Sequence, residues 1–237
     1  MCGKFTGMFS WAEIHEYGSM FTRPADGKGG GKGDSGGGND DIATYRVNGL
    51  LPVIVWDAEA RQRRVVRMRW GFPHPKDWRR PQPIHARAET VEAKEPFRTP
   101  FHAGQRGIVV FRTFNEGKEI TKPSGATATE QWTIDPQDGQ PRGFAFVWRR
   151  FEIADVPAPL LACVMVTVPA SDLIRRNIKP TEDDPRMPAI LADGEAWETW
   201  LGERSAETAD VKAVLKTMEG VNWTTAPEPK APRKPMP

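Results

Sequence analysis

The first three residues, Met1-Cys2-Gly3, carry the clearest chemical signal in the sequence. A methionine before a small residue is routinely removed, and its loss leaves Cys2 as the N-terminal residue. Such a cysteine combines a nucleophilic thiol with an α-amine whose pKa is about 8. Together these groups form an imine with an aldehyde and then close it to a thiazolidine ring. A cysteine at position 2 is also compatible with no function, so the rest of the chain must decide.

A second signal is the basic and aromatic stretch from Arg61 to Arg80. Its cations outnumber the single Asp77, and Trp70, Phe72 and Trp78 are interleaved with them. Cations for phosphates and flat rings for unpaired bases form the usual platform for single-stranded nucleic acid. The alternative is a solvated strand face beside buried tryptophans. Because the net charge is only +2, attraction to nucleic acid must come from local clusters of this kind.

Three further segments hold residues that can take part in chemistry, although none is a decisive motif alone. They are Ile84–Thr90 with the nearby Phe97-Arg98, the segment around Glu116, and Asp184–Leu191. The four histidines and two cysteines lack the spacing of metal ligands, so we predict no metal and no cofactor. The second cysteine, Cys163, lies in an apolar run and is expected to be buried and inert.

The elements that must position these residues are mostly strands. Short β-branched and aromatic segments predict strands over Pro52–Trp56, Arg64–Trp70, Gly107–Phe111 and Cys163–Val168, and a hairpin joining Gln131–Ile134 to Phe144–Trp148. Helical spacing is found at Ala170–Ile174, Gly194–Leu201 and Asp210–Met218. This pattern predicts a strand-dominated α+β fold in one compact domain over residues 1–225. Residues 24–41 are expected to form a flexible glycine-rich loop, and 226–237 a disordered tail rich in proline and lysine.

The sequence contains no apolar run of the ~18 residues that a membrane-spanning helix needs. It also lacks the basic and apolar regions of a signal peptide. We therefore expect a cytoplasmic protein without a membrane partner, and we assume a monomer.

Taken in order, these segments resemble the SOS-response-associated peptidase (SRAP) family. The family begins Met-Cys-Gly-Arg-Phe, and this chain begins Met1-Cys2-Gly3-Lys4-Phe5. The family's Arg-Trp-Gly-Leu/Phe-x-Pro is loosely matched at Arg69–Pro73, its Ala-Arg-Ala-Glu-Thr at Ala86–Thr90, and its Arg-Met-Pro-x-Ile/Leu-Leu at Arg186–Leu191. The resemblance covers residues 1–5 and 42–202, and the joint occurrence of the motifs is far more specific than any one of them.

The resemblance implies a curved, mostly antiparallel β core with few peripheral helices and a positive groove for single-stranded DNA. It further implies a thiol peptidase that removes its own Met1 and then crosslinks Cys2 to abasic sites as a thiazolidine, with lyase-like chemistry. It places the assisting glutamate at Glu116. Phosphate or base contacts are expected from Arg69, Trp70, Arg87, Arg98 and Arg186, of which Arg87 is alternatively an ion-pair partner of Glu89 or Asp184. Association with the nucleoid after DNA damage is a further expectation.

Two departures from the family pattern fall in the expected site. Where the family has an asparagine that positions the reacting terminus, this chain has His85. Where the family has a histidine that assists the chemistry, this chain has Asp184. One interpretation is that the imidazole has moved across the site, with Asp184 orienting His85 or balancing its charge, since imidazole titrates near neutrality.

The other interpretation is that the site has diverged and lost part of its chemistry. In that case the chain is a non-covalent single-stranded-DNA binding protein. A cysteine peptidase acting on proteins is the third possibility, and it requires an organised base that the usual histidine position does not supply.

Overall fold

The long strands of the main sheet form where β-branched and aromatic residues cluster in the sequence. The computed structural model describes residues 2–7, 43–138, 140, 142–154, 156–192 and 194–228. The main sheet is eight-stranded, and its long members are β3 (Leu50–Asp57), β4 (Gln62–Trp70), β8 (Arg106–Phe111), β11 (Arg142–Phe151) and β12 (Leu160–Pro169). Strand β12 pairs in parallel with β4 and antiparallel with β11, so the path β4–β3–β8–β11–β12 closes on itself as a barrel.

Three short strands complete this sheet, namely β7 (His85–Arg87), β13 (Arg186–Pro188) and β14 (Ile190–Leu191). Both β7 and β13 pair with β12, the first in parallel and the second antiparallel. Two segments that are far apart in sequence, and that both carry matched motifs, therefore lie along one barrel strand.

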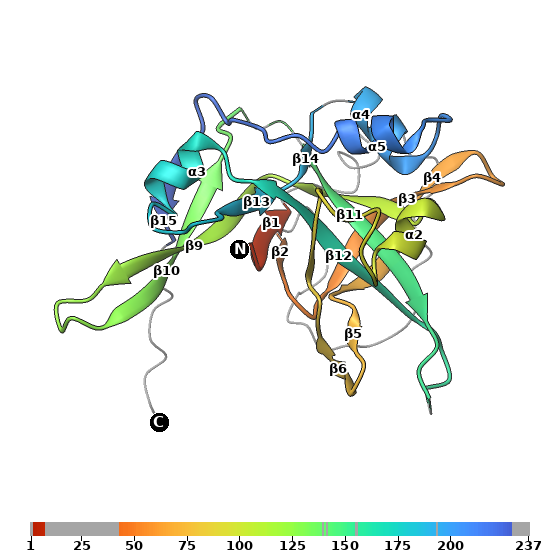
Figure 1. Cartoon of the computed structure of the whole chain (residues 1–237), viewed down its shortest axis with the longest axis horizontal. Helices are drawn as coiled ribbons and strands as arrows, with labels where there is room; N and C mark the ends of the chain where they lie inside the picture. The colour runs from red at the N-terminus through yellow and green to blue at the C-terminus, as the bar shows by residue number, and fades with distance from the viewer. Residues whose placement is uncertain are drawn as a thin grey trace.

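A second, five-stranded sheet carries the N-terminus. Its members are β2 (Ala43–Arg46), β1 (Lys4–Gly7), β9 (Thr113–Thr121), β10 (Thr127–Asp135) and β15 (Thr224–Pro227). The β9–β10 hairpin extends away from the barrel, whereas β1 lies against it (Figure 1). A separate small hairpin is formed by β5 (Pro73–His74) and β6 (Asp77–Pro81).

The helices are short and lie outside the barrel (Figure 1): α2 (Arg98–His102), α3 (Asp172–Asn177), α4 (Gly194–Leu201) and α5 (Thr208–Ala213). Helix α3 begins after Ser171, whose side chain accepts a hydrogen bond from the Ile174 backbone at 3.5 Å, as an N-cap residue does. Helix α4 buries Trp197, Trp200 and Leu201, the apolar face that its spacing predicts.

Aromatic packing joins the N-terminal strand to the barrel. The Phe5 ring lies 5.4 Å from Phe144 and 5.5 Å from Trp70, centroid to centroid, and Phe111 stacks on Phe144. Each such aromatic pair is worth about 0.5–1.5 kcal/mol beyond the area that it buries. Because Phe5 is fully buried, the backbone that leads to it from Cys2 is held against the barrel.

The predicted fold class is confirmed: strands dominate, helices are few, and a curved β core forms one domain. The predicted helix at Gly194–Leu201 is α4. The predicted hairpin is wrong, because β10 pairs with β9 and β15 whereas β11 pairs with β8, β12 and β14. The predicted tail begins too early, since Ala226 and Pro227 belong to β15. The glycine-rich loop lies outside the described residues.

Candidate functional site

Cys2 lies directly before β1 and is buried, with 1% relative exposure. Its thiol donates to the carbonyl oxygen of Lys4 at 3.3 Å. Burial, and after it the negative charge of Glu116, raises the pKa of the Cys2 thiol to about 12. The sulfur is therefore a neutral thiol at pH 7 and needs a proton acceptor before it attacks an electrophile.

His85, at the start of β7, holds the backbone of Cys2. Its Nε2 lies 2.7 Å from the Cys2 carbonyl oxygen, and because that oxygen only accepts, Nε2 must be the protonated nitrogen. Burial lowers the pKa of His85 to about 4, although the bond to Cys2 opposes the shift. At pH 7 the ring is thus neutral and donates one hydrogen bond, as an asparagine amide does. This geometry favours a positioning role for His85 over a proton-transfer role.

Glu116 faces Cys2 from β9, the strand that pairs with β1. The register places Lys4 opposite Asn115, so Glu116 lies beside the residues that precede β1. Its carboxylate is completely buried and forms an ion pair with the equally buried Lys179, at 2.9 Å between Oε2 and Nζ. The pKa of Lys179 is raised, because the charge and hydrogen bond of Glu116 outweigh burial, which alone lowers it. Lys179 is therefore protonated at neutral pH.

Lys179 is the site residue that the sequence analysis missed. It follows α3, and its backbone N–H bonds to the Ile174 carbonyl at 3.0 Å, which fixes where the side chain starts. A lysine in a charged loop is normally solvated, so no local pattern marks it as buried. The only available signal was indirect: with Asp184 in the histidine position, the expected site lacked a partner of positive charge for Glu116.

Asp184 takes a different place from the one that the histidine hypothesis requires. Its carboxylate pairs with Arg87 at 2.8 Å and lies 3.7 Å from Arg186, and it is half-exposed. Its ion pairs in the described part of the chain are with these arginines, and none is with His85. The structure thus brings Cys2, His85 and Glu116 together, with Lys179 instead of Asp184 as the fourth member.

Three of the five expected DNA contacts are core residues. Trp70 is fully buried and donates to the Ile84 carbonyl, which leaves no face for a base. Arg69 is buried and donates to the Trp78 carbonyl at 2.7 Å. Arg186 is 5% exposed and forms a two-pronged ion pair with Glu89 at 2.6 and 2.7 Å. All three side chains are buried inside the fold, so they are not accessible to phosphates or bases in this structure.

The other two, Arg87 and Arg98, are on the surface, with 62% and 58% relative side-chain exposure. The β5–β6 hairpin adds the partly exposed Trp78, with the Arg79 guanidinium 5.0 Å from its ring centroid. Of the basic and aromatic stretch, this hairpin is the part that presents a ring and cations to solvent. The sequence also allowed Arg87 to be an ion-pair partner of Glu89 or Asp184, and in the structure it pairs with Asp184.

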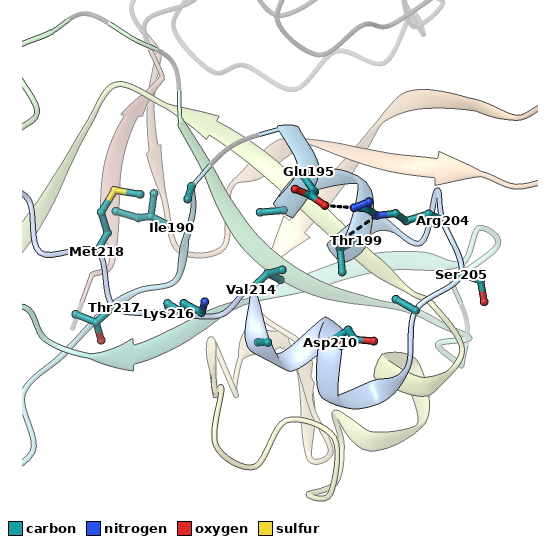
Figure 2. Close-up of a pocket in the computed structure, with 14 residues that line it drawn as sticks. Ile190, Glu195, Thr199, Arg204, Ser205, Asp210, Val214, Lys216, Thr217 and Met218 are labelled. Carbon is teal, nitrogen blue, oxygen red and sulfur yellow. Dashed lines mark hydrogen bonds and ion pairs between the residues drawn. The ribbon is translucent and has the colours of Figure 1, made fainter.

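A cavity of about 730 Å³ lies between α4, α5 and the segment after α5 (Figure 2). Its polar lining includes the ion pair of Glu195 and Arg204, and Val214 and Met218 are among its apolar lining residues. The members of the Cys2 cluster do not line this cavity. This cavity is therefore separate from the Cys2 cluster.

Among the described residues, no group of three or more His, Cys, Asp and Glu side chains is arranged to hold a metal ion. Within the same residues, no helix is long and apolar enough to cross a membrane.

The fold matches solved structures over nearly the whole chain. A protein from Bordetella bronchiseptica has a TM-score of 0.72 at 19% identity, covering 97% of this chain and 100% of its own. A protein from Bacteroides thetaiotaomicron has a TM-score of 0.64 at 23% identity, covering 81% and 82%. A phage-related protein from Bordetella bronchiseptica has a TM-score of 0.63 at 17% identity, covering 97% and 95%. No curated protein matches the sequence.

The sequence also matches a family model, described as SOS response associated peptidase (SRAP), over residues 1–230. This match includes the N-terminal cysteine, the strand with Glu116 and the Arg-Met-Pro segment. It associates the chain with the response to DNA damage and with a peptidase or DNA-processing role. The chain therefore belongs to the SOS response associated peptidase family.

Proposed function

We propose that this chain, once Met1 is removed, captures abasic sites in single-stranded DNA as a thiazolidine on Cys2. The observation that carries the proposal is the placement of Cys2 itself. Its carbonyl oxygen accepts a hydrogen bond from His85 Nε2 at 2.7 Å, and the negative charge of the buried Glu116 raises the pKa of its thiol. An N-terminal amine, a thiol and a carboxylate then meet in one place, which is the set of groups that thiazolidine formation needs.

The reaction balances with these groups alone. Glu116 accepts a proton from the α-ammonium, and the amine adds to the aldehyde carbon of the ring-opened sugar. The protonated carboxyl returns that proton to the departing hydroxyl, so one water leaves and an iminium forms. The thiol then loses its proton to Glu116, and sulfur bonds to the iminium carbon to close the ring. Because the thiol is neutral at pH 7, this second proton transfer is as necessary as the first.

Removal of Met1 is the step that prepares the site. It adds one water across the peptide bond between Met1 and Cys2 and frees the α-amine. We propose that the protein performs this hydrolysis itself, in keeping with the family's peptidase name. The intact mass of protein made without active methionine aminopeptidase tests it: the wild type loses the mass of methionine, and Glu116→Gln retains it under the same conditions.

The exposed cations favour DNA as the carrier of the aldehyde. Arg87 lies two residues after His85 on the same strand, β7. Its exposed side chain is therefore placed to bind a phosphate close to the site. Trp78 and Arg79 on the β5–β6 hairpin offer a ring and a cation to an unpaired base. Single-stranded DNA is favoured over duplex, because a stacking side chain needs an unpaired base to contact.

The test is adduct formation with a single-stranded oligonucleotide that carries one abasic site. We expect an adduct that survives heat and denaturant with the wild type, and none with Cys2→Ala. A matched oligonucleotide whose abasic aldehyde has been reduced to the alcohol controls for binding without reaction. Salt-sensitive binding to both oligonucleotides without an adduct would instead establish the non-covalent alternative. Hydrolysis of unrelated peptides without DNA would establish the cysteine peptidase.

A further inference from the structure

Lys179 is a completely buried lysine whose ammonium faces the carboxylate that the proposed reaction uses. Relative side-chain exposure is 0% for both Lys179 and Glu116. Removing an ammonium from water is unfavourable, and lysine is rarely fully buried unless it is paired. A shorter or apolar side chain would fill this position at a lower desolvation cost. The charge of Lys179 therefore needs an explanation beyond packing.

The ammonium is held by several elements at once. Besides Glu116 on β9, it donates to the Arg186 carbonyl on β13 at 3.2 Å, and it lies 3.6 Å from the half-exposed carboxylate of Glu182. The backbone of Lys179 is fixed by α3. With three directions of contact, Nζ has one position, and Glu116 is held in turn on the side of the barrel where Cys2 begins the chain.

We propose that Lys179 is a positioning residue that keeps Glu116 ionised beside Cys2, so that Glu116 can act as the base of the crosslinking reaction. This inference rests on the proposed thiazolidine chemistry. It assigns to a lysine, supplied from the end of α3, the support that the family resemblance expects from a histidine at position 184.

Neighbouring charges explain why this support is required. The groups that face the Glu116–Lys179 pair are the α-amine at the N-terminus, the Cys2 thiol, the His85 imidazole and the Glu182 carboxylate. At pH 7 the thiol and the imidazole are neutral, and the α-amine must give up its proton before it attacks the aldehyde. Burial disfavours the charged form of a carboxyl, and the buried ammonium of Lys179 opposes that effect at Glu116.

Lys179 is not itself the amine that captures the aldehyde. Imine formation needs a neutral amine, whereas the ion pair with Glu116 keeps the ammonium protonated. Borohydride, which reduces an imine to a stable amine, provides a direct check. Cys2→Ala treated with abasic DNA and borohydride should give no adduct on Lys179, and an adduct there would overturn the assignment.

The main experiment is the pH dependence of adduct formation under single-turnover conditions. Lys179→Gln keeps a hydrogen-bond donor but removes the charge, so we expect the acid limb to move up by at least one pH unit. At pH 7 its rate should fall at least tenfold. Lys179→Arg retains the charge and should restore the acid limb. The matched control is Lys212→Met, which removes a lysine of α5 that pairs with Glu92, and it should leave the profile unchanged.

A double variant tests whether Lys179 acts through Glu116. In the Glu116→Gln background, Lys179→Gln should slow the reaction less than twofold further, and an additional loss of tenfold or more would overturn the inference. An unchanged profile for folded Lys179→Gln would do the same.

A titration without DNA separates this inference from the proposed function. The ¹³C signal of the Glu116 carboxyl, assigned with Glu116→Gln, should titrate at acidic pH in the wild type and at higher pH in Lys179→Gln. If the wild type forms no adduct, the proposed function fails, but this titration still decides whether Lys179 controls Glu116. A wild-type carboxyl that titrates near neutrality would overturn the inference, even where Lys179→Gln does not fold.

Discussion

Two ion pairs with very different geometry flank the matched segments of this chain. Arg186 and Glu89 join β13 to the loop after β7 by two parallel hydrogen bonds, and Glu89 is half-exposed. Lys179 and Glu116 join the end of α3 to β9 through an ion pair at 2.9 Å, and both are completely buried. The first pair uses the bidentate fork of arginine, which is suited to clamping a structure. The carboxylate of the second pair acts electrostatically on the Cys2 thiol, whose pKa it helps to raise.

The difference teaches how to distinguish a structural pair from a reactive one. A clamp satisfies both carboxylate oxygens and lies where water can assist. The carboxylate that we propose to be reactive is removed from water, is paired with a buried cation and acts on the Cys2 thiol. Sequence motifs do not make this distinction, since Glu89 and Arg186 both belong to family motifs whereas Lys179 belongs to none.

The largest effect is expected from removing one partner of the Arg186–Glu89 ion pair. Glu89→Ala leaves the Arg186 guanidinium buried without its carboxylate, which should lower the free energy of unfolding by about 3 kcal/mol. Arg186→Met removes the buried charge itself and leaves a carboxylate that water can solvate, so it should cost less. Urea unfolding of both variants measures the difference. An equal or larger loss for Arg186→Met would show that Arg186 contributes mainly through packing.

Removing the carboxylate charge of the other pair should affect the chemistry instead. Glu116→Gln should slow adduct formation about 100-fold, in the range of general acid–base catalysis, which is about 2.7 kcal/mol of barrier. The corresponding change in the clamp, Glu89→Gln, is the control and should change the rate less than about twofold at a temperature where it is folded. Single-turnover gels measure both rates. Similar rates for the two variants would remove the distinction between the pairs.

The barrel was predictable from the sequence because its strands have strong local signals. The segment Val164–Val168 is β-branched except for Met165, and helix α4 has an apolar face at helical spacing. The wrong hairpin between β10 and β11 has a physical cause. Two adjacent strand signals and a turn predict pairing, but the choice of partner depends on the packing of the whole sheet, and β10 and β11 belong to different sheets.

The site was predictable in part, for a related reason. Cys2 and Glu116 are positions that the family motifs mark, and the structure places them together. Burial of Lys179, Arg69 and Trp70 depends on contacts between distant segments, such as β9 with the end of α3, which no local pattern encodes. Charged residues in a basic stretch look alike in sequence whether their partner is a phosphate or a backbone carbonyl.

Acid should lower the free energy of unfolding through His85, which holds the Cys2 carbonyl near the Glu116–Lys179 pair. Its pKa is about 4 in the folded state, below the ordinary value of 6.5, so between these values the unfolded chain binds a proton that the folded chain does not. The His85 contribution is therefore nearly complete above pH 6.5 and is lost as the pH falls, by about 2.5 kcal/mol at pH 4.5. Urea unfolding at pH 7.5 and 4.5 measures the loss. His85→Asn keeps a donor for Cys2 without titrating, and it should show a loss that is smaller by that amount. An equal loss in both proteins would exclude His85 as the titrating group.

The smallest effect is expected at Arg87, the exposed arginine that pairs with Asp184. Its side chain is 62% exposed and shared with Asp184, so a phosphate must compete with that carboxylate. Arg87→Gln should weaken binding to single-stranded DNA only a few-fold and reduce the slope of log K against log salt by ~0.7. Arg176→Gln on α3, which removes an arginine of similar exposure from a pair with Asp172, is the matched control. A full reduction of the slope for Arg176 and none for Arg87 would move the DNA path to the α3 side of the barrel. Lys179 would then lie beneath the DNA, and the buried pair would have to be reached from that face.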